Sequence, residues 1–277
     1  MAATTSTTLD DLFVNIIAQA RFTAEEQSLM AGLVTQYNIQ TSAGKVIQVP
    51  KYSAVTAADL TEGTDMSSTA VSTSKVDISI GEVGAQVVLT DMATYGADSP
   101  ATAMGTILGS AIATKMDKDL IALFAGFSGA LGAAGAEITV ADLFKAAATL
   151  RANKVLGVIN AVIHPYQAYQ IKAGLTNTFA NPNGGDLQNE AMRNGYVGTI
   201  AGINVYESAN IAIDASDDAV GAVFAPEALA MAIKRDFNMA PQRDESLRAW
   251  ELNATAVYGV AELDDSYGVK ITSDAAL

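Results

Sequence analysis

The 277-residue sequence contains no cysteine and only one histidine, His164. The absence of cysteine excludes disulfides, iron–sulfur clusters, thiolate zinc sites and cysteine nucleophiles. A single histidine excludes a metal site built from several imidazoles, and any Ser-His-Asp triad would have to use that residue. Because His164 precedes Pro165 at the end of an apolar run, we interpret it as a strand-end side chain bonded to backbone rather than as a general base.

Positive charge is also scarce. Lys and Arg total 16 against 30 Asp and Glu, so the formal net charge is −14. This balance argues against sequence-independent binding to DNA or to an anionic membrane, since both depend on Lys and Arg patches. No run of 18 strongly apolar residues is present, and the first basic residue, Arg21, lies too late for a secretory signal. Hydrophobic residues make up 50% of the chain, which excludes intrinsic disorder and predicts a substantial core.

Enzyme motifs are equally rare. The glycine-rich run GALGAAG at 129–135 matches neither the dinucleotide fingerprint nor a P-loop, and we interpret it as a flexible linker. The acidic groups at 214–218 and 264–265 offer oxygen ligands for Ca²⁺, but neither has the spacing of an EF-hand, so solvated turns are expected. We therefore expect no catalytic residue, no cofactor and no metal.

The first 91 residues change from helical to strand-like periodicity. Apolar residues recur at helical spacing between residues 9 and 34, which predicts one or two amphipathic helical segments. Residues 45–50 predict a strand stopped by Pro50, and residues 75–91 predict a second strand. Between them, residues 53–74 hold ten Ser or Thr and no aromatic residue. Two strand arms with a long polar tip are unusual in a compact domain and suggest a functional extension.

The strongest single element is a helix over residues 100–124. Asp98-Ser99-Pro100 is a typical helix start, and apolar residues follow at i, i+3, i+4 spacing to Phe124. Such a helix would be about 38 Å long. Leu108 and Ile112 lie mid-helix on the apolar face, so we expect them in the core.

The remaining sequence mixes helices and strands without regular alternation, which favours an α+β fold over a doubly wound one. Helices are expected at 139–154, at 165–174 and at the start of 226–237, and strands at 157–165, 196–208 and 220–226. The C-terminal region predicts a long strand and a return strand, joined by a turn at 264–266.

From residue 9 to the end, this order of elements resembles the major capsid proteins of tailed bacteriophages (Caudoviricetes), which have the Hong Kong 97-like fold. The segments that carry the resemblance are the two strand arms of 45–91, the helix at 100–124, AVIHPYQAYQIKAGL (161–175), GTIAGINVYES (198–208), FAPEALAMAIKRDF (224–237) and the closing strands. The resemblance implies five segments: an N-terminal arm (1–44), an extended β-loop (45–91), a peripheral domain with a long spine helix (92–136), an axial domain (137–225) and return strands of the peripheral domain (226–277).

The implied function is that of a major capsid protein, not an enzyme. It would self-assemble into pentamers and hexamers of an icosahedral shell, be located in the virion and assemble in the host cytoplasm. The implied partners are other copies of the chain, a portal protein, a decoration protein, and a separate scaffolding protein, since only about 40 residues precede Lys45. The shell would enclose double-stranded DNA without tight specific binding and without contacting a membrane.

We expect subunit contacts from residues of the arm, the loop and one basic cluster. The basic cluster consists of Lys234, Arg235, Arg243 and Arg248. It is interleaved with Asp236, Asp244, Glu245 and Glu251, so ion pairs within or between subunits are expected there. The candidate contact residues are Leu12, Phe13, Ile16, Lys51, Tyr52, Leu60, Met66, Lys75, Lys234, Arg235, Arg243 and Arg248.

Three other functions fit parts of the sequence. An encapsulin-like nanocompartment has the same fold but packages enzymes. A secreted structural or adhesive protein would fit the Thr-, Ser- and Ala-rich, cysteine-free composition, but no export signal is visible. A hydrolase is the weakest alternative, because the catalytic constellation it needs is missing.

Overall fold

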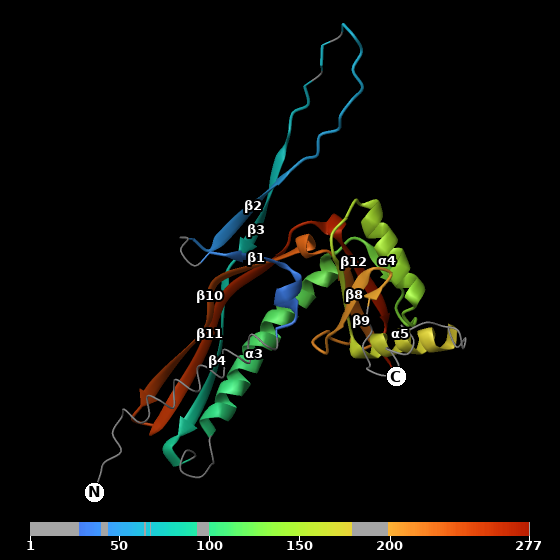
Figure 1. Cartoon of the computed structure of the whole chain (residues 1–277). Coiled ribbons are helices and arrows are strands. Elements are labelled where there is room, and N and C mark those ends of the chain that lie inside the picture. The colour runs from blue at the N-terminus through green and yellow to red at the C-terminus, as the bar shows by residue number, and fades with distance from the viewer. Residues whose placement is uncertain are drawn as a thin grey trace.

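The computed structural model describes residues 28–39, 44–63, 65–66, 68–92, 100–178 and 199–276, and the burial of side chains for these residues except 100–103 and 175–178. Figure 1 shows an elongated molecule with three parts: a two-stranded ribbon at one end, a long sheet with helix α3 along it, and a second unit in which helices α4 and α5 lie beside another sheet. None of the helices in the described ranges is long and apolar enough to span a membrane.

The long sheet has the strand order β1-β10-β11-β4. Strands β10 (Leu229–Asp244) and β11 (Ala249–Glu262) form an antiparallel hairpin, β4 (Gly81–Thr90) is antiparallel to β11, and β1 (Thr35–Asn38) is parallel to β10. Along β11, Leu252, Ala254, Ala256 and Tyr258 are buried while the intervening residues are partly exposed. One face of this sheet therefore forms a core with α3, as period-two alternation requires.

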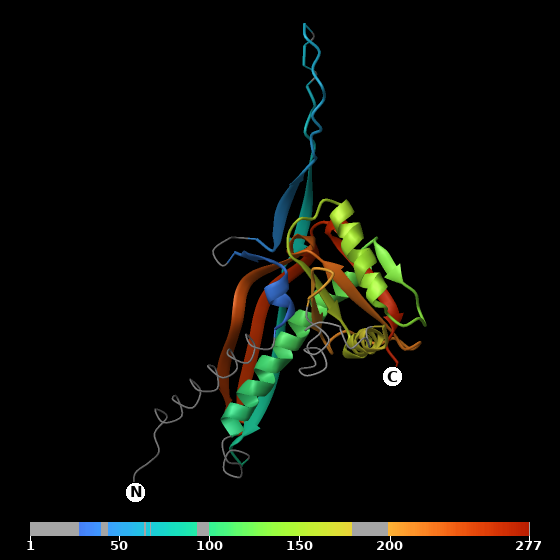
Figure 2. The same ribbon diagram turned by 45° about the vertical axis from the view of Figure 1, so that its right-hand side comes forward.

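Helix α3 (Pro100–Ala122) runs along that face, as Figures 1 and 2 show. Leu108 and Ile112 are each only 1% exposed, so the predicted orientation of the helix is confirmed. Ile107 is an exception, because 54% of it is exposed. The short helix η2 (Leu123–Gly126) continues α3 and buries Phe124.

A buried carboxylate ties α3 to the chain that precedes it. Asp117 is 1% exposed, and its oxygens accept hydrogen bonds from the backbone N–H groups of Leu29 and Met30, each at 3.2 Å, and from the Ser28 hydroxyl at 3.1 Å. These bonds satisfy free N–H groups at the start of the 3₁₀ helix η1 (Met30–Leu33). Burial nevertheless raises the pKa of Asp117, because desolvation disfavours the charged form.

The second sheet has the order β5-β12-β9-β6-β8-β7. Its strands are β5 (Ala130–Gly132), β6 (Ile159–Ile163), β7 (Thr199–Ile200), β8 (Ile203–Glu207), β9 (Asp218–Phe224) and β12 (Gly268–Asp274). Every residue of β6 is buried, as its apolar run predicts. Residues of α4 (Val140–Ala152) and α5 (Pro165–Thr178) share one core with these strands. The capping box of Thr139 and Asp142 starts α4.

The C-terminal strands divide differently from the expected segments. The turn at 264–266 was expected to return the chain beside the preceding strand, but β11 lies in the long sheet and β12 lies in the second sheet. The glycine-rich run at 129–135 is not simply a linker, because residues 130–132 form β5 and pair with β12. Gly132 has φ 76°, and a side chain there would collide with the backbone of Thr272, so this edge pairing requires glycine.

Three other local expectations were wrong. Residues 226–237 were expected to begin as a short helix, but η3 (Pro226–Ala228) is a single 3₁₀ turn and β10 follows at once. Ala230, Met231 and Ala232 pair with β11 and are buried, so tertiary contacts override their helix propensity. The single strands expected over 75–91 and 196–208 are each two strands, and Pro50 lies within its strand rather than ending it.

The N-terminal helical segments expected before residue 28 and the start signal Asp98-Ser99 lie outside the described residues. The same holds for the candidate contacts Leu12, Phe13 and Ile16.

Candidate assembly surfaces

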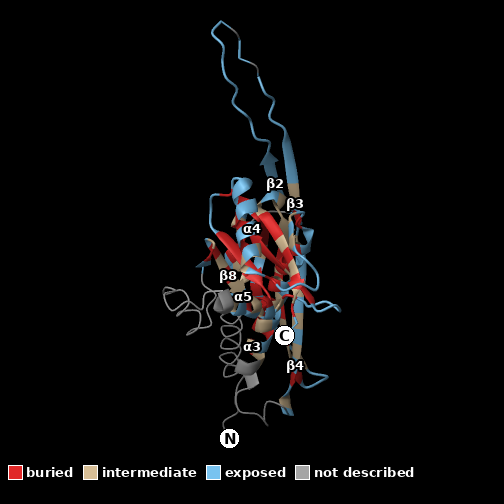
Figure 3. Ribbon diagram, turned by 90° about the vertical axis from the view of Figure 1, so that its right-hand side faces the viewer, coloured by how far each residue is buried: buried red, intermediate tan, exposed pale blue. Residues whose placement is uncertain are grey.

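The ribbon consists of β2 (Val46–Tyr52) and β3 (Thr73–Ser79), paired from Val46 opposite Ser79 to Tyr52 opposite Thr73. Beyond this ladder, Ser53 and Ser72 still bond through backbone at 3.0 Å, and the chain then continues without regular structure. Every described residue from 53 to 72 is exposed. Figures 1 and 3 show this segment extending well beyond the body of the molecule. We call residues 53–72 the acidic loop, because their charged residues are Asp59, Glu62 and Asp65.

The base of the ribbon, in contrast, is seated firmly on the long sheet. Ile78 is fully buried against Ala230 and Ala232, and Ile47 and Val49 pack around this small core. Gly259 of β11 allows the ribbon to pack closely against the long sheet, because a side chain there would collide with the backbone oxygen of Ser79.

Two lysines fasten the ribbon base to the body. The Lys51 ammonium lies 2.6 Å from an oxygen of Asp264, and Lys234 donates to the carbonyl oxygen of Gly44 at 2.6 Å. Lys51 and Lys234 were candidate subunit contacts, and the structure gives both of them partners within the subunit. The position of the loop is therefore fixed at its base, while the described residues of its tip are exposed.

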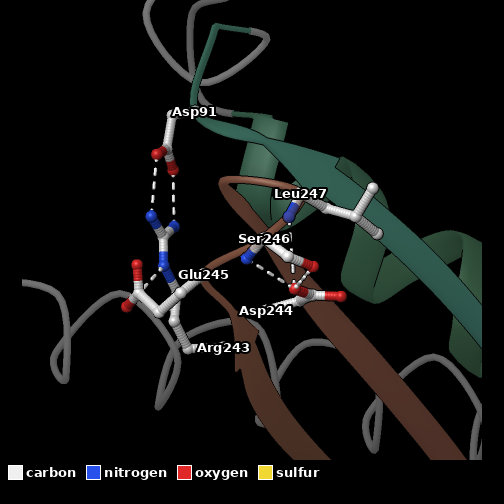
Figure 4. A network of polar contacts seen from close by, with 6 residues as sticks. All are labelled: Asp91, Arg243, Asp244, Glu245, Ser246 and Leu247. Atoms are coloured by element: carbon white, nitrogen blue, oxygen red, sulfur yellow. Dashed lines mark hydrogen bonds and ion pairs between the residues drawn. The ribbon is translucent and has the colours of Figure 1, made fainter.

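At the far end of the long sheet, the hairpin tip (residues 243–250) joins β10 to β11. Figure 4 shows that Arg243 points its guanidinium at Asp91, with N–O distances of 2.6 and 2.8 Å. This bidentate hydrogen bond lowers the pKa of Asp91 and raises that of Arg243. The guanidinium also lies 5.4 Å from the centre of the Trp250 ring, within cation–π range.

The turn within the hairpin tip is closed by its own side chain. One oxygen of Asp244 accepts hydrogen bonds from the N–H of Ser246 at 2.8 Å, the hydroxyl of Ser246 at 2.6 Å and the N–H of Leu247 at 3.2 Å. These bonds lower the pKa of Asp244, with the Ser246 hydroxyl as the largest cause. The hairpin tip is thus ordered by contacts within the chain, and it presents Leu247, 57% exposed, and the exposed Arg248 to solvent.

The basic cluster does form ion pairs, although mostly not with the expected carboxylates. Arg235 pairs with Glu82 of β4 at 2.8 Å, and Arg243 pairs with Asp91 and, as expected, with Glu245. Asp244 bonds to its own turn instead, and Glu251 accepts from Gln86 at 3.2 Å. Glu82 and Asp91 lie 153 and 152 positions away from Arg235 and Arg243, so sequence proximity could not identify these two partners.

The other candidate contacts are the exposed side chains of the ribbon and loop. Tyr52 is 67% exposed, Leu60 65% and Met66 73%. Lys75 lies on β3, 3.5 Å from Asp77 of the same strand. Such large exposed apolar side chains on one extended segment are typical of an interaction surface.

The acid–base groups singled out in the sequence have structural partners. His164 is 8% exposed, its Nδ1 accepts from the N–H of Tyr166 at 3.2 Å, and burial lowers its pKa, which keeps it neutral. Asp214 accepts from two backbone N–H groups of its own turn, and Asp218 is buried and accepts from Gly135. Within the described ranges, no group of three potential ligands could hold a metal ion.

Sequence reasoning missed a surface on the second unit. Leu156 is 94% exposed, the highest fraction of any large apolar side chain in the described residues, and Phe144 and Val158 are exposed by 56% and 59%. The signal that could have found it is the run from residue 143 to 185, which contains four cations and no carboxylate in a chain of net charge −14.

Comparison with solved structures identifies the fold. The capsid protein of Cyanophage P-SCSP1u superimposes with a TM-score of 0.71 at 17% identity, over 88% of this chain and 87% of that one. A protein of Mycobacterium phage Che8 gives 0.70 at 21%, over 88% and 90%, and a virus-like particle from Pyrococcus furiosus gives 0.61 at 10%, over 92% and 97%. No family model and no curated sequence matches the chain. The expected α+β, Hong Kong 97-like fold of phage capsid proteins is confirmed.

Proposed function

We propose that this chain, which folds as phage capsid proteins do, is the major capsid protein of a tailed bacteriophage. It assembles into pentamers and hexamers that close into an icosahedral shell around double-stranded DNA, and its role is structural rather than enzymatic. The observation that carries the proposal is the acidic loop. It is held on a rigid base and exposes Leu60 and Met66, yet it lies beyond the reach of its own subunit's core.

The energetics of the loop support an assembly role. Ordering each residue costs about 1–2 kcal/mol of backbone entropy, and an exposed polar segment recovers almost none of this by burial within the subunit. Contacts with a second copy would supply the missing burial. A projecting arm that binds another part of a neighbouring copy makes a heterologous contact, which generates rings when the rotation closes.

The treatment of DNA follows from the charges. Arg235 and Arg243 are engaged by Glu82 and Asp91, and tight non-specific binding requires several free phosphate contacts from Lys or Arg. The shell therefore encloses the genome without gripping it. The partners that complete such a particle are a scaffolding protein, a portal and a decoration protein, with assembly in the host cytoplasm.

A nanocompartment of the same fold is the second candidate. The observation behind it is the similarity to the virus-like particle from Pyrococcus furiosus, which has a lower TM-score than the two phage structures.

The test is to express the chain alone and with the scaffolding protein of its phage, and to examine the products by sedimentation and electron microscopy. We expect closed shells that can be filled with DNA in the phage. Shells that instead hold a protein cargo would favour the nanocompartment. A monomer at every concentration, with and without scaffold, would contradict both.

A further inference from the structure

Asp117 is buried at a point where three separate parts of the chain meet. It lies near the C-terminal end of α3 and is 1% exposed. The 3₁₀ helix η1 packs against α3, as the blue turn beside the helix in Figures 1 and 2 shows. The third part is the loop that follows β8 in the second unit. We call residues 28–34 the entry segment and residues 208–211 the β8 loop.

The β8 loop joins the second unit to the core under the long sheet. The N–H of Ser208 donates to the carbonyl oxygen of Ile163, the last residue of β6, at 3.0 Å, so the loop starts on the second sheet. The N–H of Asn210 then donates to the Ser208 hydroxyl at 3.3 Å. Ile211 is 3% exposed and belongs to the same core as Leu108 of α3. The β8 loop therefore passes from one unit into the core of the other.

The entry segment enters that core from the N-terminal side. Met30 is fully buried and Leu33 is 9% exposed, and both share the core with α3. The segment continues into β1, which pairs with β10. Its first residues are held by Asp117, which accepts hydrogen bonds from the Ser28 hydroxyl and the N–H groups of Leu29 and Met30. The entry segment is thus fixed to the sheet at one end and to a single carboxylate at the other.

The hydrogen-bonding capacity of Asp117 is fully used. A carboxylate has two oxygens with about four lone-pair sites. Three donors come from the entry segment, and the side chain of Asn210 in the β8 loop supplies another hydrogen bond. Within the described residues no ion pair involves Asp117. Hydrogen-bond donors from two different segments therefore share the task of compensating one buried carboxylate.

We propose that Asp117 couples the entry segment to the β8 loop, so that displacement of either one from α3 loosens the other. At a site that is 1% exposed, water does not readily replace a lost donor. Losing one donor leaves the buried carboxylate incompletely paired, which is costly and favours its movement toward solvent. The donors of the other segment then lose their acceptor.

This coupling goes beyond the proposed function and does not depend on it, because it concerns one subunit. A coupling free energy between two sites is reciprocal, so each segment must affect the other by the same factor. A partner that draws the entry segment away from α3 therefore also loosens the second unit at the β8 loop. A change in the placement of the second unit acts on the entry segment in the same way.

Hydrogen exchange of the full chain tests the coupling, with all variants compared at one pH and in one assembly state checked by sedimentation. Asn210→Ala removes a donor that belongs to the β8 loop. It should lower the protection factors of the entry segment about tenfold, the order expected when a hydrogen bond to a charged group is lost. Ser28→Ala should lower the protection factors of the β8 loop by the same factor.

Two further variants show whether the effect passes through the carboxylate. Asp117→Asn keeps the shape of the side chain but turns one acceptor into a donor, so it should lower protection in both segments at once. The double variant Ser28→Ala with Asn210→Ala should lose clearly less protection than the product of the two single losses, because both substitutions act on one acceptor.

Asp119→Asn is the matched control on the same helix. The Asp119 side chain is 28% exposed, and its partners are Lys115 of α3 and the hydroxyl of Tyr258 in β11, at 2.5 and 2.7 Å. This variant should leave the protection factors of both segments unchanged.

The coupling is overturned if each single variant loses protection only in its own segment, or if the loss in the double variant equals the product. An equal loss in the Asp119→Asn control would overturn it as well, since the effect would then belong to the helix as a whole. If Asp117→Asn fails to fold, the two single variants and their combination still decide, because each substitution removes only one side-chain donor.

Discussion

The acidic loop and the hairpin tip are both turns at the ends of antiparallel strand pairs, but their side chains are used differently. At the hairpin tip, Asp244 closes its own turn and Arg243 binds Asp91, so local structure is complete within one chain. In the described part of the acidic loop, the last hydrogen bonds between the arms join Ser53 and Ser72. Protruding strands therefore do not define a contact surface by shape alone. The acidic loop, whose described residues are all exposed, is the better candidate for binding another subunit.

The largest expected effect comes from removing the acidic loop. Replacing residues 54–71 with a two-residue Asn-Gly turn should abolish shell formation, because the removed residues carry the intersubunit contacts, while thermal unfolding of the subunit stays unchanged. Sedimentation and calorimetry measure the two effects separately. If the shortened chain fails to fold, the loop contributes to the core, and the contrast drawn between the acidic loop and the hairpin tip is wrong.

The second-largest effect is expected on the stability of the subunit, from a substitution in the core between α3 and the long sheet. Ile112→Ala should destabilise the subunit by about 2–5 kcal/mol, because it leaves a cavity between α3 and the long sheet. Lys118→Ala, on the exposed side of the same helix, should change the free energy of unfolding by within about 0.5 kcal/mol. Thr114 is a poorer control, since it is partly buried. Denaturant titration of unassembled protein gives both values, and equal costs would refute the orientation of α3.

The hairpin tip should respond to acid. The pKa of Asp91 is lowered by Arg243, so this pair contributes stability above the ordinary pKa of about 3.8, and the contribution is lost as pH falls through the lower value in the folded state. Protection factors for hydrogen exchange at residues 243–250, which are corrected for the pH dependence of the intrinsic rate, should therefore fall at low pH, and Arg243→Ala should remove that dependence.

The pKa of Asp117 is shifted in the opposite direction, so the region around this residue serves as the internal reference. Its pKa is raised by burial, so its contribution is fully present below about 3.8 and is lost as pH rises through the higher folded value. Protection factors near η1 should not fall in acid together with those of the hairpin tip. A common response of both regions would indicate global unfolding rather than local release.

The smallest effect is expected at the base of the ribbon. Lys51→Ala removes the ion pair with Asp264, but the Lys51 side chain is 48% exposed, so the free energy of unfolding should change by at most about 1 kcal/mol. Gly259→Ala is the informative contrast, because its side chain would displace Ser79 and with it the ribbon. Urea titration of both variants measures the difference, and an equal loss would show that the ion pair, not the packing, seats the ribbon.

Local pattern in the sequence predicted the elements whose periodicity is strong and whose contacts are near in sequence. These are helix α3 with Leu108 and Ile112 inward, helix α4, the buried strand β6, and the polar extension between two strand arms. Each depends on side-chain spacing and on hydrogen bonds within a few residues. The exclusion of cysteine and multi-histidine chemistry followed from composition alone.

Tertiary structure decided where the strands pair and which charges meet. Whether residues 229–232 are helix or strand depends on burial against β11, and whether β12 returns to the long sheet depends on β5 and β9 being available in the other. The pairing of Arg243 with Asp91 joins residues 152 positions apart. The sequence pattern gives the period of an element but does not identify the strands and helices that it packs against. Long-range pairing depends on how whole faces of sheets and helices are buried together. The same reason explains why the polar composition of the loop could be read from the sequence, while the packing of Ile78 at the ribbon base on Ala230 and Ala232 was visible only in the fold.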